Sequence, residues 1–304
     1  MFDQEYKRTK KLNKTIKLNL KRRTVIVDDK LVKHKGVPVP SWIELSIIDV
    51  CNRSCLFCPK SDPAIAPNTY ERMSMKLIEK LTKELKEINF NGSVTLCGYG
   101  EPMLHTEVFL FVKKLAEAAF VEIVTNGDTL KPEAINKLYN SNANKLLISL
   151  YDGPEQLSKF KSMVEKSNVP QDFVILRDRW HDETKDYGLK LTNRSGTINV
   201  GKQEDLNKYT YCNYPSYSLM IDWNGDVFLC PQDWQRKVTM GNVMKENLYE
   251  IWTGDIISEY RKNLLKGKRC DSPCKECNAE GTILGKQHAL NWRQIYELDR
   301  KKNV

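Results

Sequence analysis

The sequence predicts an α/β protein with a parallel sheet, followed by a small cysteine-rich module. Between residue 42 and about residue 201, short apolar runs rich in β-branched residues alternate with longer segments of helical periodicity. After about residue 202 the chain changes to cysteines, aromatic residues and turns that contain glycine. At 304 residues it is long enough for one sizeable α/β domain and a second, smaller one.

The first domain is expected to be a partial or complete barrel. A helix separates each predicted strand from the next, so the strands should run parallel with helices covering the sheet. Ser74 and Pro132 suit helix starts, as an N-cap and a first helical residue. In such sheets, ligands bind at the carboxyl ends of the strands. Strands are predicted at residues 43–48, 93–97, 121–125, 146–150 and 173–176, and helices at 74–88, 107–119, 132–139 and 154–166.

The second part of the chain has its own predicted elements. Asn224-Gly225 is a two-residue turn signature and predicts a hairpin around residues 222–226. A helix is predicted over residues 248–265. A final amphipathic helix is predicted over residues 287–301, with Leu290, Ile295 and Leu298 on its apolar side.

The net charge of +9 is concentrated in an N-terminal arm. Residues 1–35 carry twelve Lys or Arg and four Asp or Glu. A basic arm can bind nucleic acid or another anionic partner, but aromatic residues do not alternate with these charges as in single-strand binders. We therefore interpret residues 1–40 as a solvated extension that leads through a first strand at residues 24–27 into the core, and expect no nucleic-acid partner.

The cysteine content indicates a reducing compartment. The chain has nine cysteines and nothing that resembles a secretion signal, which favours metal binding over disulfides. No apolar run approaches the roughly 18–20 residues that cross a bilayer. We expect a cytoplasmic protein with no membrane partner.

Three cysteines, Cys51, Cys55 and Cys58, follow the first predicted core strand with the spacing C-x3-C-x2-C. Three thiolates can hold three corners of a [4Fe–4S] cluster, which normally has four Cys ligands, so one iron would stay open. A zinc knuckle is the alternative, but zinc ligands usually come as two pairs. The triplet resembles that of the radical SAM superfamily, in which S-adenosylmethionine chelates the open iron through its amino and carboxylate groups. The resemblance implies a partial (βα)6, TIM-like barrel.

The motif Gly98-Tyr-Gly-Glu-Pro102 ends the second core strand. Its glycines let the backbone approach a ligand closely, and Glu101 offers a carboxylate to an ammonium group. It resembles the Gly-Gly-Glu-Pro motif of the superfamily, with Tyr99-Gly100 in place of two glycines. Asn-Gly and Asp-Gly dipeptides stand at later strand ends. They could line a ligand site there, or they could simply make ordinary turns. The resemblance implies that S-adenosylmethionine contacts Phe57, Gly98, Gly100, Glu101, Pro102, Asn126 and Ser149.

The cysteines after residue 200 predict a second cluster. The pattern Cys212-x12-Gly225-x4-Cys230 resembles the start of a SPASM domain, an auxiliary-cluster module. A full SPASM domain has seven cysteines, and the five here fit its shorter twitch form with one cluster. The alternative is a four-cysteine zinc site. The resemblance implies one auxiliary [4Fe–4S] cluster held by Cys212, Cys230, Cys274 and Cys277, in a module over residues 202–280 between the core (41–201) and a C-terminal helix (281–304).

The resemblance also implies the reaction. Reductive cleavage of S-adenosylmethionine gives a 5′-deoxyadenosyl radical, which removes a hydrogen atom from the substrate, and the auxiliary cluster suits an electron acceptor. We expect a dehydrogenase-like oxidoreductase that converts an alcohol of a small sugar or aminocyclitol to a ketone, with a flavodoxin- or ferredoxin-type electron donor. The alternatives are modification of a ribosomally made precursor peptide and a radical epimerase. A further alternative is a non-catalytic iron–sulfur carrier. Such a protein would not need the Gly-Glu-Pro motif at a strand end, so the motif argues against it.

Two cysteines have no ligand role in this scheme. Cys97 fits a buried strand residue, and Cys270 is an alternative ligand of the second cluster. Either thiol would serve an epimerase as its hydrogen donor, which makes Cys97 and Cys270 the candidate catalytic residues. Arg177 and Arg194 are the candidate substrate contacts, because they lie in polar stretches after the fifth predicted strand and before the second module.

Overall fold

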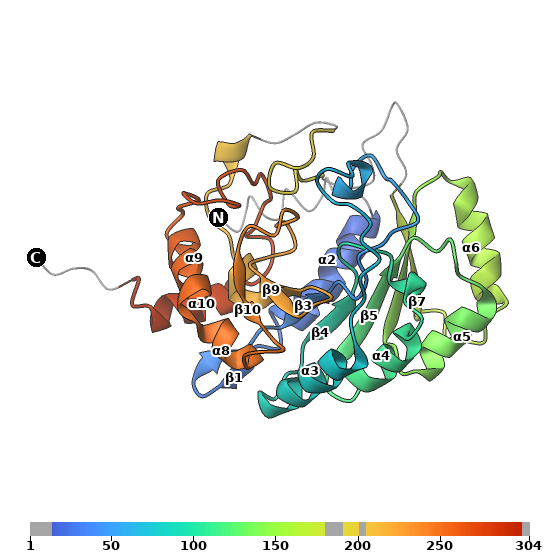
Figure 1. The fold of residues 1–304 in the computed structure, drawn as a ribbon, viewed down its shortest axis with the longest axis horizontal. Helices are drawn as coiled ribbons and strands as arrows, with labels where there is room; N and C mark the ends of the chain where they lie inside the picture. The colour runs from blue at the N-terminus through green and yellow to red at the C-terminus, as the bar shows by residue number, and fades with distance from the viewer. Residues whose placement is uncertain (1–13, 180–190, 201–204, 300–304) are drawn as a thin grey trace, which may run out of the picture.

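The computed structural model describes residues 14–179, 191–200 and 205–299 (Figure 1). Its centre is an eight-stranded sheet in the order β10-β9-β8-β3-β4-β5-β6-β7. From β8 to β7 the neighbouring strands pair parallel, whereas β8, β9 and β10 pair antiparallel. The predicted α/β architecture with a parallel, barrel-like sheet is confirmed.

The helices and strands alternate through the first domain as predicted. The strands of the large sheet are β3 (Trp42–Leu45), β4 (Ser93–Leu96), β5 (Phe120–Thr125), β6 (Lys145–Leu150), β7 (Val174–Asp178), β8 (Ser218–Ile221), β9 (Asp226–Phe228) and β10 (Thr239–Asn242). A separate hairpin consists of β1 (Lys33–His34) and β2 (Val37–Pro38). The helices are α2 (Lys14–Val27), α3 (Met75–Glu87), α4 (Val108–Leu115), α5 (Pro132–Asn140), α6 (Glu155–Glu165), α7 (Tyr214–Tyr217), α8 (Leu248–Thr253), α9 (Asp255–Leu265) and α10 (Lys286–Ile295), with 3-10 turns η1 (Pro59–Ser61), η2 (Pro102–Leu104) and η3 (Leu206–Lys208).

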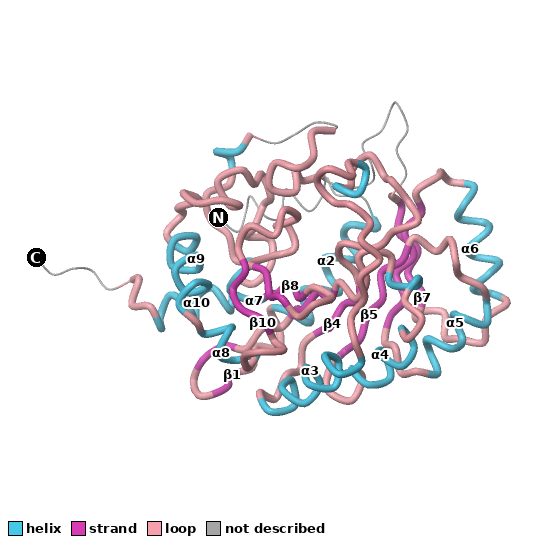
Figure 2. Tube along the Cα trace, viewed as in Figure 1, coloured by secondary structure: helices cyan, strands magenta, loops and turns pink. Residues whose placement is uncertain are grey.

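The two faces of the parallel strands differ in polarity. Successive side chains of a strand point to opposite faces, and Ile43 and Leu45 of β3 belong to the main apolar core under helices α3 to α6 (Figure 2). Glu44, between them, lines a cavity on the other face, as do Thr95 of β4 and Glu122 of β5. The barrel therefore has an apolar outer layer and a polar interior.

The N-terminal arm differs from its prediction. Residues 24–27, predicted as a strand, are the last turn of helix α2. Thr24, Val25, Ile26 and Val27 are β-branched, but Ile26 and Val27 are buried against Trp42, Tyr217 and Leu284, and this packing overrides their strand preference. The arm is not a solvated extension throughout, because Arg22 and Arg23 of α2 line the interior cavity. Residues 1–13 lie outside the described part.

The C-terminal module also departs from its prediction in three places. The hairpin of β8 and β9 is confirmed, but the Asp222 N–H donates to the Asp226 carbonyl, so residues 223–225 form a three-residue loop instead of a two-residue one. The helix predicted over residues 248–265 is divided at Gly254 into α8 and α9. In α10 the buried residues are His288, Ala289 and Trp292, whereas Leu290 and Ile295 are exposed, so the predicted apolar face was wrong for these two residues. Leu298 lies after the end of α10 and is partly buried against the main core.

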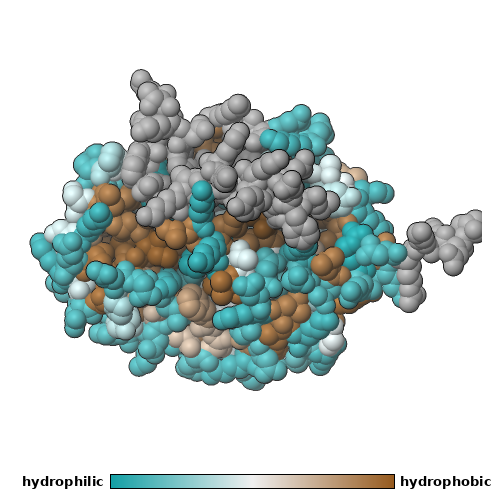
Figure 3. Space-filling model, turned by 180° about the vertical axis from the view of Figure 1, so that it is seen from behind, coloured by the Kyte–Doolittle hydropathy of each residue, from teal (hydrophilic) through white to brown (hydrophobic). Residues whose placement is uncertain are grey.

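The module is joined to the barrel through the sheet itself. Strand β8 pairs parallel with β3 from Trp42–Ser218 to Leu45–Ile221, and so adds a sixth parallel strand. Seen from behind, apolar side chains occupy the middle of the molecule between hydrophilic ones (Figure 3). Within the described residues, we find no helix that is long and apolar enough to cross a membrane.

Candidate active site

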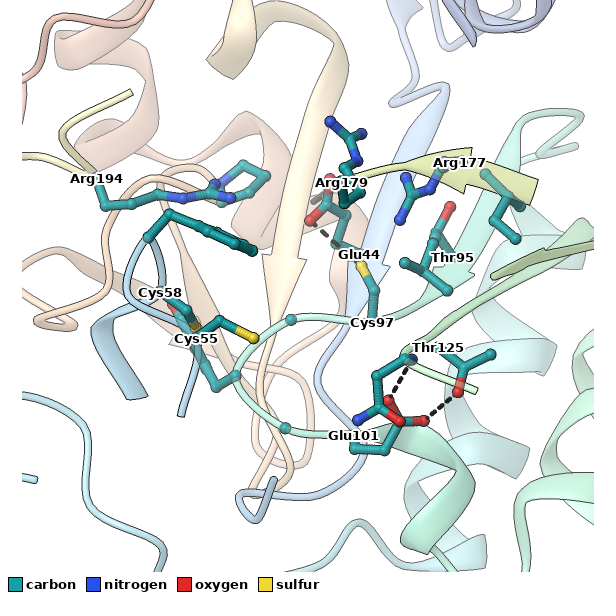
Figure 4. A pocket seen from close by; sticks show the side chains of 18 of the residues that line it. Glu44, Cys55, Cys58, Thr95, Cys97, Glu101, Thr125, Arg177, Arg179 and Arg194 are labelled. Atoms are coloured by element: carbon teal, nitrogen blue, oxygen red, sulfur yellow. Dashed lines mark hydrogen bonds between the residues drawn. The ribbon is translucent and has the colours of Figure 1, made fainter. Parts of the chain in front are cut away.

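A cavity of about 400 Å³ lies on the polar face of the sheet (Figure 4). This volume is in the range of small-molecule sites. Strands β3 to β7, the loop after β3 and helix α2 all contribute to its wall. Of the residues that the sequence pointed to, the cavity is lined by Cys51, Cys55, Phe57, Cys58, Cys97, Gly98, Gly100, Glu101, Asn126, Arg177 and Arg194. The topology therefore gathers motifs that lie far apart in the sequence.

Ion pairs hold the cysteine loop over the strand ends. Arg53, between Cys51 and Cys55, donates to Asp128 after β5 (2.6 Å) and to Asp152 after β6 (2.6 and 2.7 Å). These hydrogen bonds, first those to Asp152 and then those to Asp128, raise the pKa of Arg53. Sequence reasoning missed this clamp, because Asp152-Gly and the segment before Asp128 read as turns and nothing local indicates a partner in another loop.

The three thiols of this loop share one environment. Burial raises the pKa of Cys51 and Cys58, and it raises the pKa of Cys55 to about 12 with further contributions from Cys58 and Cys51. All three residues line the same cavity. Metal ligation requires thiolates, so binding a cluster would release protons from this loop. As a donor set, three neighbouring free thiols fit an iron–sulfur cluster with one open iron.

Glu101 is fixed as an acceptor beside the cysteine loop. Its carboxylate accepts hydrogen bonds from Thr125 Oγ1 (2.7 Å), from the Asn126 backbone N–H (2.8 Å) and from that of Met103 (3.0 Å) (Figure 4). Burial raises the pKa of Glu101, and these hydrogen bonds act in the opposite direction. The buried carboxylate can neutralise an ammonium group, and Thr125 is a supporting residue that sequence reasoning did not single out.

Gly100 allows the motif to touch the base of the cysteine loop. A Cβ on this residue would overlap the carbonyl oxygen of Ile48 and lie 2.7 Å from that of Val50. The Glu101 N–H donates to the same Val50 oxygen at 2.8 Å. A side chain at Gly100 would therefore separate Glu101 from the loop. Pro102 starts the short 3-10 turn η2 behind Glu101 and is buried rather than exposed to the cavity.

Polar groups fill the interior between the strands. Glu44 accepts hydrogen bonds from Trp42 Nε1 (3.2 Å) and from the Cys97 thiol (3.4 Å) (Figure 4). Burial, with the nearby Glu44 carboxylate, raises the pKa of Cys97, so this thiol stays protonated. Arg177 donates to Ser149 Oγ at 2.7 Å, which places Ser149 behind the arginine and outside the cavity wall. Cys270 is exposed and does not line this cavity.

A second group of thiols gathers in the C-terminal module. Cys212, Cys230, Cys274 and Cys277 come from three segments. Burial raises the pKa of Cys230, and the charges of Cys274, Cys277 and Cys212 raise it further. Arg269 fixes the surrounding backbone by donating to the carbonyls of Cys277 and Ala279. Within the described ranges, no three or more Cys, His, Asp or Glu side chains are placed so that they could hold a metal ion. By their number and type, the four free thiols match the usual ligand set of a [4Fe–4S] cluster.

Tyr99 connects the two cysteine regions. It is buried, its hydroxyl donates to the Asp233 carbonyl at 2.9 Å, and its ring lies 4.8 Å from that of Trp234. Asp233 and Trp234 follow Cys230 closely in the sequence. The Asp233 carboxylate accepts from the N–H groups of Lys237 and Val238, so it stabilises a turn. The tyrosine that replaces a glycine of the motif therefore attaches the barrel to the second module.

Comparisons with known proteins agree with this geometry. The model of the radical SAM superfamily matches residues 45–197, and that of an iron–sulfur cluster-binding domain, SPASM, matches residues 212–278. The S-adenosyl-L-methionine-dependent 2-deoxy-scyllo-inosamine dehydrogenase of Niallia circulans is 30% identical over 244 residues, which are 78% of this chain and 92% of that protein. The crystal structure of BtrN in complex with AdoMet and 2-DOIA has a TM-score of 0.68 and 27% identity, covering 83% of this chain and 98% of that one. AdoMet-bound anSMEcpe shares the fold, with a TM-score of 0.51 and 15% identity over 86% of this chain and 94% of that one.

Proposed function

The chain belongs to the radical SAM superfamily, and from this premise we propose that it oxidises a hydroxyl group of a small sugar or aminocyclitol to a ketone. The observation that carries the proposal is the shared cavity, in which the cysteine loop and Glu101 face the same space as a polar interior. The similarity to a dehydrogenase over 92% of that protein's length supports the reaction type. The volume of about 400 Å³ supports a small substrate over a folded peptide.

We assign the cofactors to residues as follows. Cys51, Cys55 and Cys58 hold the cluster that binds S-adenosylmethionine, and Glu101 receives the ammonium group of its methionine moiety. When bound, these groups supply a radical that removes a hydrogen atom from an unreactive C–H bond. The second cluster is held by Cys212, Cys230, Cys274 and Cys277, whose four thiols leave no open ligand position.

The protein's own part is positioning and proton handling. Arg53 keeps the cysteine loop closed on the strand ends through Asp128 and Asp152. Oxidation of a hydroxyl group also releases a proton, and three carboxylates line the described part of the cavity, those of Glu44, Glu101 and Glu122. Glu101 faces the cysteine loop and Glu122 is paired with Arg22. Glu44 is therefore the proposed proton acceptor.

The reduction step requires an external electron donor, for which we propose a flavodoxin- or ferredoxin-type carrier. The net charge of +9 favours association with an acidic protein of this kind. The donor is tested by replacing a chemical reductant with each carrier and by measuring the salt dependence of turnover, which should slow as ionic strength rises.

The reaction is tested with anaerobically reconstituted protein, S-adenosylmethionine and a panel of cyclitols and sugars deuterated at individual carbons. We expect deuterium in 5′-deoxyadenosine and a product two mass units lighter than the unlabelled substrate. A product that has the mass of the unlabelled substrate in ordinary water, and that is one mass unit heavier in deuterated water, would instead identify a radical epimerase. The position of Cys97 in the cavity favours that second candidate. Failure to form 5′-deoxyadenosine with every polyol would contradict both.

A further inference from the structure

Three arginines meet inside the barrel, away from the cysteine loop. Arg22 and Arg23 come from helix α2 and Arg177 from strand β7, and all three line the cavity. The guanidinium of Arg23 lies 4.2 Å over the ring of Trp42, the first residue of β3. The cysteine loop follows the opposite end of that strand. The arginines of α2 therefore close the cavity at the base of the barrel.

These guanidinium groups are not fully satisfied by the protein. Arg22 forms an ion pair with the buried Glu122. In the described structure, the buried Nε and Nη2 atoms of Arg23 and the buried Nε of Arg177 have no hydrogen-bond partner. Buried polar groups are normally paired, and an unpaired buried charge is especially costly. The two carboxylate oxygens of Glu122 also have no hydrogen-bond partner, but Glu122 is paired with Arg22, so the free donors of Arg23 and Arg177 point to a missing acceptor.

The charge balance specifies the acceptor. Three guanidinium groups face the carboxylates of Glu44 and Glu122, so this part of the cavity has excess positive charge. Burial, together with the charges of Arg23 and Arg177, lowers the pKa of Arg22 to about 9, as expected for like charges that lie close together. Figure 4 shows Arg177 and Glu44 directed into the same space. A bound anion would remove the repulsion, whereas a free ammonium group would add to it.

We propose that Arg22, Arg23 and Arg177 form an anion subsite that binds a phosphate or carboxylate group of the substrate. The inference rests on the proposed function and narrows its substrate to an anionic sugar or cyclitol. Guanidinium groups present planar pairs of N–H donors that match the oxygens of phosphate and carboxylate. The anionic group is bound at the base of the barrel, so the opposite end of the substrate points toward the cysteine loop.

The test is equilibrium binding to the reconstituted protein with S-adenosylmethionine and without reductant. Calorimetry compares glucose with glucose 6-phosphate and glucuronate, and myo-inositol with its 1-phosphate. We expect the anionic members to bind at least tenfold more tightly than the neutral ones. Whichever class binds more tightly, the phosphates or the carboxylate, identifies the group that the subsite recognises. Arg23→Gln and Arg177→Gln should each remove this preference, and Arg23→Lys should restore part of it. Lys21→Gln is the matched control, because it removes an exposed charge from the same helix.

Thermal unfolding shows whether each variant is folded and whether it still binds an anion. Inorganic phosphate should raise the melting temperature of the wild-type protein and of Lys21→Gln, but not that of Arg23→Gln. Equal affinity for charged and uncharged members overturns the subsite, as does an unchanged preference in Arg23→Gln. If the arginine variants weaken only the binding of S-adenosylmethionine, the arginines bind its carboxylate group. That result would also overturn the proposed subsite. Oxidation of neutral polyols with no anion preference refutes only the subsite, whereas selective binding without oxidation refutes only the proposed function.

Discussion

The two cysteine regions of this protein are built in opposite ways. Cys51, Cys55 and Cys58 lie within eight residues on one loop, are partly exposed and face a cavity. The second group comes from three distant segments, and two of its thiols, those of Cys230 and Cys277, are buried. An open, three-thiol site at a cavity suits the binding of a reactant. A closed, four-thiol site suits electron transfer, because no ligand position is left for a substrate.

The largest effect of a substitution is expected at the first cysteine site. Replacing Cys51, Cys55 and Cys58 together with Ala should remove one cluster, so iron falls from about eight to about four atoms per chain, as expected for four-iron clusters. Formation of 5′-deoxyadenosine should fall to background, because the open iron is lost. Iron analysis and chromatography measure the two quantities. Iron near zero would contradict two independent sites.

Damage to the second site should separate cleavage from oxidation. In the double variant Cys212→Ala with Cys230→Ala, we expect 5′-deoxyadenosine to form while the ketone product is lost, because the electron acceptor is absent. The ratio of the two products measures the uncoupling. Cys270→Ala is the matched control, since its thiol is exposed and is not among the thiols that raise the pKa of Cys230. A ketone yield equal to that of the wild-type protein would show that the second cluster accepts no electron.

A smaller effect is expected from the buried carboxylate at the first site. Glu101→Gln should weaken binding of S-adenosylmethionine by roughly 10- to 100-fold, because a charge-assisted hydrogen bond to the ammonium group contributes about 1.5–3 kcal/mol. Iron content should stay unchanged. Exposed Glu79→Gln is the control. A dissociation constant like that of the control would remove Glu101 from the site.

The same carboxylate predicts a pH dependence. Burial raises the pKa of Glu101 above its usual value. Because only the ionised form attracts an ammonium group, affinity for S-adenosylmethionine should be full above that pKa and should fall as the pH drops through it. In Glu101→Gln this dependence should be absent, which equilibrium binding between pH 5 and pH 8 can check. An identical slope in wild-type and variant would assign the titration to another group.

The difference between the regions also explains what the sequence could predict. The spacing of Cys51, Cys55 and Cys58 is local, and strands β3 to β7 alternate with helices of regular periodicity, so both could be read from the chain. The clamp from Arg53 to Asp128 and Asp152 depends on neighbouring strand ends meeting in space, which no local pattern shows.

Helix α2 is the clearest case of tertiary packing overriding local preference. Thr24 to Val27 is a run of β-branched residues that favours a strand, yet the burial of Ile26 and Val27 beside Trp42 makes it helical. The wrong assignment also hid Arg22 and Arg23, because a helix is needed to bring them into the barrel. Likewise, Leu290 and Ile295 suggested the apolar face of α10, but the neighbouring elements cover His288 and Trp292 instead.

The smallest effects are expected from the two cysteines outside both groups, and they separate the dehydrogenase from the epimerase. Cys97 lies in the cavity and its protonated thiol donates to Glu44, whereas Cys270 is exposed. If the product radical is oxidised, Cys97→Ala should change turnover by no more than about twofold and lower stability by about 1 kcal/mol, the typical cost of a single substitution. Cys270→Ala should change neither. Loss of product in Cys97→Ala, with 5′-deoxyadenosine still formed and solvent deuterium no longer incorporated, would show instead that this thiol donates a hydrogen atom. The polar interior would then serve inversion of a carbon centre, and one electron and one proton, with the electron supplied by the external donor, would be needed to restore the Cys97 thiol after each turnover.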